Sequence, residues 1–176
     1  MNKRFAVIMA FALISSTNTH AQTQETFGYK VSEIQLATFQ RLVVNAGIDI
    51  VLLQNDTLKK AFVEGDEKLV GDIKFLVCDG VLTITSAHRI SYRGKLQVTI
   101  AVNNLSRIDI NAAAGIASVN TLQSPALSVI INGDCDIQLS SVGHIAFSGA
   151  AGCEVAYVRT EKKAGRRIEF YEALSD

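Results

Sequence analysis

The 176-residue sequence has no tryptophan and one proline, and aromatic residues make up only 7% of it. So few rings leave little material for the aromatic platforms that stack on nucleic-acid bases. A surplus of either charge is also lacking, because 17 basic and 17 acidic side chains give a formal net charge of zero. Proteins that bind nucleic acid usually carry a basic surplus. We therefore expect no nucleic-acid partner.

The motifs of common catalytic and metal sites are missing as well. His88 and His144 have no second ligand at metal-binding spacing. Ser148 lacks the glycine two positions earlier that a nucleophile elbow needs. Gly149 and Gly152 lack the lysine and helix of a phosphate loop. We predict no catalytic residue, no metal site and no cofactor, and the sequence alone assigns no ligand-binding residue.

One acidic bend allows a different hypothesis. Asp134 and Asp136 flank Cys135 and could offer oxygens to calcium, or act as a pair in polysaccharide cleavage. A small β-helix enzyme of this kind would use Asp134, Asp136 or Glu154. Calcium needs six to eight oxygens, whereas the neighbouring repeats have alanine or glycine at the matching positions. We favour solvated turn residues over a metal or catalytic site.

Only the first segment contains a long apolar run. Residues 1–4 are a short basic start, residues 5–14 are continuously apolar, and small residues precede Gln22. This layout is typical of a secretory signal peptide, and ten apolar residues are too few to span a bilayer. We predict a signal peptide over residues 1–21, a lead-in over 22–38 and one domain over 39–176. The mature chain, without a transmembrane span, would then be exported to the periplasm, the outer-membrane surface or the medium.

The three cysteines cannot all pair within one chain. Cys135 and Cys153 lie in apolar repeats, where cysteine usually serves as a small buried hydrophobe, and Cys78 precedes a turn. We favour three thiols over a Cys135–Cys153 bridge, although export permits either.

Short β-branched runs bounded by Gly, Asn and Asp predict strands. These runs are 42–44, 48–53, 73–77, 81–85, 96–102 and 108–110. Asp79-Gly80 between two runs predicts a hairpin. The one helical candidate spans Asp66 to Asp72.

A repeated unit predicts how the strands are arranged. Each copy has an apolar strand end, a small polar residue, a bend of tiny residues and a new apolar start, in Ile110–Ile116, Ile131–Ile137 and Phe147–Cys153, with a shorter copy at Val44–Ile48. Copies 21 and 16 residues apart are typical of a solenoid. The polar residues would form one hydrogen-bonded column of Asn45, Asn111, Asn132 and Ser148.

The predicted fold class is therefore all-β. We expect a right-handed β-solenoid, a β-helix-like stack of short strands, with an antiparallel β-sandwich as the alternative. Alternating residues in 154–160 and 166–172 predict a closing hairpin at the carboxyl end, which would cap the open edge of the stack.

Two basic clusters remain, His88-Arg89 with Arg93 and Lys95, and Lys162-Lys163 with Arg166-Arg167. For an exported chain, anionic glycans or lipid headgroups are more plausible targets than nucleic acid. Charges at hairpin tips also serve solubility. Tyr92 beside Arg93 could stack on a sugar, but one ring is not a platform.

Residues 39–170 resemble a bacterial family common in Bacteroidetes, the putative auto-transporter adhesin, head GIN domain. The resemblance is carried by the order of the segments 39–50, 63–69, 79–84, 96–110 and 147–152. The triplet Gly-Ile-Asn itself is absent, and Gly47-Ile48-Asp49 and Gly115-Ile116-Ala117 are its nearest relatives. The resemblance implies an exported module of the cell envelope, with adhesion suggested by the family's name, and supplies no site residues.

We therefore predict a non-catalytic envelope or surface module that binds an unknown macromolecule, such as a glycan or a surface protein. The carbohydrate-active enzyme described above is one alternative. A self-assembling structural protein, in which the turns of neighbouring copies stack as a homo-oligomer, is the other.

Overall fold

The computed structural model describes residues 28–90, 96–149, 153–163 and 166–174. The predicted signal peptide lies outside these residues. The described part is almost entirely strand, with one short helix, α1 (Glu67–Val70). This helix lies where the sequence predicts it, and the Asp66 carboxylate caps it by accepting from the backbone N–H of Lys68 at 2.9 Å. Within the described residues, no helix is long and apolar enough to cross a membrane.

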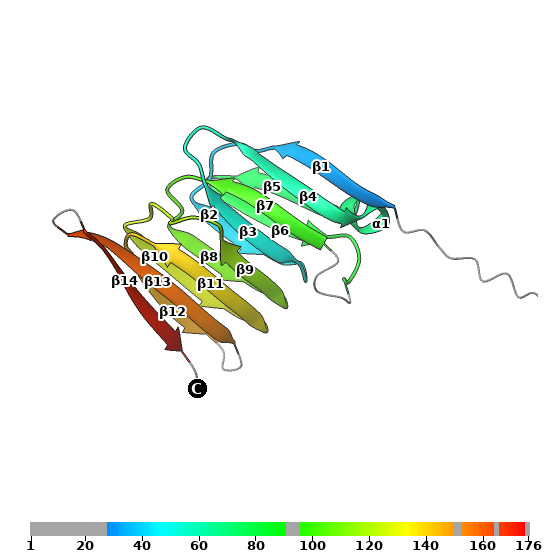
Figure 1. The fold of residues 1–176 in the computed structure, drawn as a ribbon. Helices are drawn as coiled ribbons and strands as arrows, with labels where there is room; N and C mark the ends of the chain where they lie inside the picture. The colour runs from blue at the N-terminus through cyan, green and yellow to red at the C-terminus, as the bar shows by residue number, and fades with distance from the viewer. Residues whose placement is uncertain (1–27, 91–95, 150–152, 164–165, 175–176) are drawn as a thin grey trace, which may run out of the picture.

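The strands form two mixed sheets that lie in two layers (Figure 1). The eight-stranded sheet has the order β1 (Tyr29–Gln35), β4 (Lys60–Asp66), β7 (Leu96–Val102), β3 (Asp49–Gln54), β9 (Ala114–Ser118), β11 (Cys135–Ser141), β13 (Glu154–Lys163) and β14 (Arg166–Leu174). The six-stranded sheet has the order β12 (His144–Gly149), β10 (Ala126–Ile131), β8 (Arg107–Ile110), β2 (Arg41–Val44), β6 (Val81–Ser86) and β5 (Ile73–Cys78). The all-β prediction is confirmed.

From β8 to β13 the chain alternates between the two sheets. Each strand of the six-stranded sheet is followed by one of the eight-stranded sheet, and the next pair stacks on it in parallel. The strands β2 and β3 join this stack through parallel pairing with β8 and β9. The repeated units Ile110–Ile116 and Ile131–Ile137 are the bends that lead from β8 to β9 and from β10 to β11.

The ends of the eight-stranded sheet are antiparallel. β13 and β14 pair from Val155↔Leu174 to Lys163↔Arg166, so the predicted closing hairpin is confirmed. At the other end, β1 pairs with β4 and β4 with β7. β1 lies within the segment that the sequence presents as a lead-in, residues 22–38.

The Asp79-Gly80 hairpin is also confirmed, because β5 and β6 are antiparallel with Cys78 opposite Val81. Asp79 has φ of 50° and Gly80 has φ of 74°. Two successive positive φ angles are what a two-residue type I′ turn requires, and Asp-Gly accommodates them well.

One core fills the space between the sheets. Alternate residues of each strand point inward, so that Ile50, Ile116 and Ile137 stand in register on neighbouring strands and are all buried. Buried residues of both sheets form a single cluster. Removing this apolar surface from water is the main stabilising contribution to the stack.

Close approach of successive bends explains the small residues in them. A Cβ added at Gly133 would lie 2.7 Å from the backbone carbonyl carbon of Ala112 in the preceding bend. Such a contact is shorter than van der Waals separation, so this position excludes any side chain. The sequence predicts this close approach from the tiny residues of the repeat.

The predicted polar column is confirmed for three of its four members. Asn45, Asn111 and Asn132 each follow a strand of the six-stranded sheet, and the register aligns them. Ser148 does not belong to the column, because it pairs with Ile130, two residues before Asn132. β12 runs on to Gly149, so its strand end falls later than the sequence pattern suggests.

Candidate functional site

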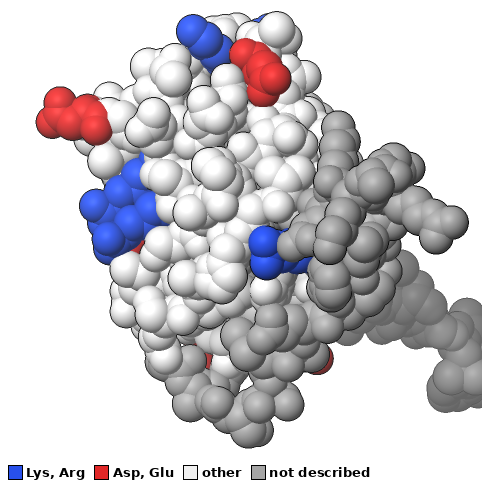
Figure 2. Space-filling model, turned by 90° about the vertical axis from the view of Figure 1, so that its left-hand side faces the viewer, with Lys and Arg blue, Asp and Glu red and all other residues white. Residues whose placement is uncertain are grey.

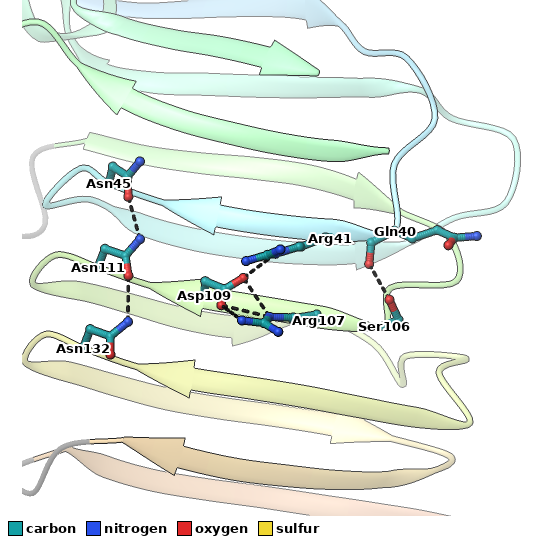
Figure 3. A network of polar contacts seen from close by, with 8 residues as sticks. All are labelled: Gln40, Arg41, Asn45, Ser106, Arg107, Asp109, Asn111 and Asn132. Atoms are coloured by element: carbon teal, nitrogen blue, oxygen red, sulfur yellow. Dashed lines mark hydrogen bonds and ion pairs between the residues drawn. The ribbon is translucent and has the colours of Figure 1, made fainter. Parts of the chain in front are cut away.

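Two arginines and one aspartate form a polar cluster on the outer face of the six-stranded sheet (Figure 3). Arg41 and Arg107 stand directly opposite each other on β2 and β8. The Asp109 carboxylate accepts from Arg41 Nε at 2.6 Å and from Arg107 Nη2 at 2.7 Å. Like charges on neighbouring strands repel, so this shared counterion is what allows the two guanidinium groups to be adjacent.

Opposing effects act on the carboxyl group of Asp109, whose side chain is only 7% exposed. Burial raises its pKa, but the hydrogen bonds from Arg107 and Arg41 and their positive charges lower it, and the pKa lies below its ordinary value of 3.8. Asp109 is therefore charged at neutral pH. The cluster carries a net positive charge of one, with both arginines held by the same carboxylate.

The asparagine column is a directed chain of hydrogen bonds (Figure 3). Asn132 Nδ2 donates to Asn111 Oδ1 at 2.8 Å, and Asn111 Nδ2 donates to Asn45 Oδ1 at 2.8 Å. Hydrogen bonds that share one direction polarise one another. The amide nitrogen of Asn45 lies on the side away from Asn111, at the donor end of the chain (Figure 3).

An open hollow of about 780 Å³ lies at this donor end. Its walls come from three segments, residues 45–47, 86–90 and 112–113, which are the bends after β2 and β8 and the end of β6. A smaller hollow of about 220 Å³ lies near residues 36–39 and 55–59. The larger one has the size of ordinary small-molecule sites.

Three polar side chains in the wall of the larger hollow differ in their hydrogen-bond and ion-pair partners. His88 Nδ1 lies 2.9 Å from the Asp72 carboxylate. Arg89 is exposed and has no ion pair or side-chain hydrogen bond within the described part of the chain. The hydroxyl oxygen of Ser86 is buried and has no partner. A buried hydroxyl without a hydrogen bond is costly, which makes Ser86 notable.

The acidic residues singled out from the sequence are only partly brought together. Asp136 and Glu154 are exposed neighbours on β11 and β13, whereas Asp134 lies in the preceding bend. None of the three is among the residues that line the hollow. The described residues contain no group of three or more His, Cys, Asp or Glu that could hold a metal ion.

Of the two basic clusters, only His88 and Arg89 belong to the hollow. Tyr92, Arg93 and Lys95 lie outside the described residues. For Lys162-Lys163 and Arg166-Arg167 the structure describes the backbone of the closing hairpin alone.

Sequence reasoning missed the arginine cluster and the roles of Ser86 and Asn45 in the hollow. A signal for the cluster is present, because Arg41 and Arg107 each lie four residues before an asparagine of the column, in the segments 41–45 and 107–111. Aligning the repeats on their asparagines would have placed the two arginines side by side. Nothing local marks Ser86, whose burial depends on the packing of distant bends.

Comparison with known proteins places the chain in a family. The family described as putative auto-transporter adhesin, head GIN domain, matches residues 38–153. No curated protein matches.

Two crystal structures have a similar fold. A putative adhesin from Parabacteroides merdae has a TM-score of 0.58 at 17% identity, over 69% of this chain and 52% of that one. A putative adhesin from Bacteroides fragilis has a TM-score of 0.59 at 17% identity, over 72% of this chain and 60% of that one. The matched region thus spans between half and three fifths of those chains. With two thirds of its length matched by the family, the chain belongs to the putative auto-transporter adhesin, head GIN domain family.

Proposed function

We propose that this protein is an exported, non-catalytic binding module of the cell envelope or cell surface. The observation that carries the proposal is an open hollow with unengaged hydrogen-bond donors at the end of a hydrogen-bonded stack. Family membership supports it through the adhesin description. The predicted signal peptide over residues 1–21 supports export.

The proposal includes the architecture that presents the hollow. We interpret the alternating parallel turns from β8 to β13 as a right-handed two-sheet β-solenoid, closed by the β13–β14 hairpin. In such a stack each turn is fixed by its neighbours, so the bends form a firm surface. A rigid surface loses less conformational entropy when it binds a macromolecule.

A binding assay with product analysis tests the proposal against the enzyme alternative. The purified chain is immobilised and exposed to fragments of envelope and host-matrix polysaccharides, and both the retained and released material are analysed for mass. Retention of unaltered fragments is expected. Cleavage products that disappear in Asp136→Ala would contradict the proposal, because Asp136 and Glu154 are the neighbouring carboxylates that a hydrolase could use.

A further inference from the structure

We propose that the hollow at the bends binds an acidic saccharide, with Arg89, Ser86 and Asn45 holding a carboxylate of the sugar. This inference rests on the proposed binding function and names the class of ligand. It follows from the charge, the donors and the shape of the hollow.

The charge comes from Arg89. The imidazole of His88, also in the wall, already faces the Asp72 carboxylate, and Arg41 and Arg107 are both committed to Asp109. Arg89 is exposed and has no such partner within the described part of the chain. A guanidinium group presents parallel N–H donors that match a carboxylate in geometry and charge. An anionic group is therefore the chemistry that this wall recognises.

The neutral donors come from two directions. Asn45 accepts from Asn111 through Oδ1, and its Nδ2 has no partner among the described residues. The Asn132–Asn111–Asn45 chain directs its donor end to the bend that forms the wall (Figure 3). Ser86 adds a buried hydroxyl without a partner. Buried polar groups are nearly always satisfied, so a rotation of the Ser86 side chain toward a ligand oxygen in the hollow would supply the missing partner.

The shape favours a sugar over a bare ion or a lipid chain. The hollow of about 780 Å³ is far larger than an inorganic anion needs. Gly47, Ala112 and Ala113 form a wall of small residues against which the face of a pyranose ring can lie. A Cβ on Gly47 would meet the backbone oxygens of Ala113 and Ile90 at 3.3 and 3.4 Å, so the wall is already closely packed there. Among the described residues the hollow is open to solvent, which suits a sugar better than an acyl chain.

The opposite end of the strands makes a contrast. It faces the viewer in Figure 2, where charged residues are few and scattered and most of the described surface is uncharged. Basic residues do lie at this end, because Lys162-Lys163 and Arg166-Arg167 flank the tip of the closing hairpin. What distinguishes the hollow is that Arg89 stands beside unengaged donors in its wall.

The test is a titration of the purified full chain with trigalacturonate, followed by isothermal calorimetry and amide chemical shifts. The matched neutral ligand is its methyl ester, which removes the charge and keeps the sugar. We expect trigalacturonate to bind, with shifts around residues 45–47 and 86–90, and the ester to bind about tenfold or more weakly. Arg89→Gln should weaken binding about tenfold or more, and Ser86→Ala about threefold to tenfold. Lys74→Gln, which removes the same charge from exposed β5, should change nothing.

Three results would overturn the inference. The first is binding of the ester as tight as that of trigalacturonate. The hollow would then bind sugars whether or not they are charged, and the proposed binding function would stand. The second is an absence of shifts at residues 45–47 and 86–90, and the third is equally tight binding of triglutamate, which would make the ligand a peptide. Breakdown of trigalacturonate into shorter products would instead contradict the non-catalytic function, so the two failures are distinguishable.

Discussion

Asn111 donates a side-chain hydrogen bond to Asn45, 66 residues away in sequence, at 2.8 Å. The bond connects the bends that follow the neighbouring parallel strands β2 and β8. Asn132 extends it to the bend after β10. The column therefore ties together bends whose backbones are held mainly by their strands.

The first prediction concerns this column. Asn132→Leu should lower the free energy of unfolding by about 1 kcal/mol, and Asn111→Leu by about 2 kcal/mol, because they remove one and two hydrogen bonds. Lys163→Leu, in the closing hairpin, is the control and should have little effect. Urea titration measures all three. Equal midpoints for the three variants would mean that the column contributes nothing to stability.

Features set by a few adjacent residues were predictable from the sequence. The two residues Asp79-Gly80 are sufficient to specify a tight turn. The asparagines of the repeat align because each follows a strand of the same sheet. Ser148 was wrongly predicted to belong to the column. Its position depends on the pairing of β12 with β10, which extends to Gly149 and which the local sequence does not determine. The hollow is formed by three segments that are far apart in the sequence, and no local sequence pattern predicts that they lie close together.

The second prediction concerns the end of β12. Gly149 has φ of 132°, and an added Cβ would collide with the carbonyl group of Ile131 on β10. Gly149→Ala should therefore cost about 3 kcal/mol of stability or more. Gly71→Ala is a matched control, because Gly71 has helical φ of −69° and nothing closer than 4.0 Å to the added carbon. Comparable thermal midpoints for these two variants would show that β12 does not approach β10 in this way.

The third prediction concerns acid stability. The pKa of Asp109 is lowered in the folded state, so its charged form stabilises the fold above pH 3.8, and this contribution is lost as the pH falls through the lower folded-state pKa. Asp109→Asn should be less stable than the natural chain by about 1–3 kcal/mol at neutral pH. The difference should shrink as the pH falls below 3.8.

Denaturant titrations from pH 7 to pH 2 provide the measurement. Asp136→Asn, which changes an exposed carboxylate on β11, should stay close to the natural chain throughout. A difference between Asp109→Asn and the natural chain that is constant with pH would mean that the arginines do not hold a charged carboxylate.

The fourth prediction concerns the cysteines, none of which forms a disulfide in the structure. Cys78 is exposed, Cys153 is half-buried and Cys135 is buried. A thiol reagent should label Cys78 at once in the native chain and Cys135 only after unfolding, because reaction requires access. Cys78→Ser should remove the fast phase. If denaturation without reductant exposes only one thiol, Cys135 and Cys153 form the bridge that the sequence left as an alternative.

Of the two locations that the proposed function allows, we expect the cell surface, because the family is described as an adhesin, and protease treatment of intact cells tests this most directly. Intact and lysed cells of the producing bacterium are digested in parallel, and the chain is detected with an antibody. We expect the protease to cleave the chain on intact cells. The treated cells should then retain less trigalacturonate than untreated cells. Protection of the chain until the cells are lysed would contradict binding at the surface.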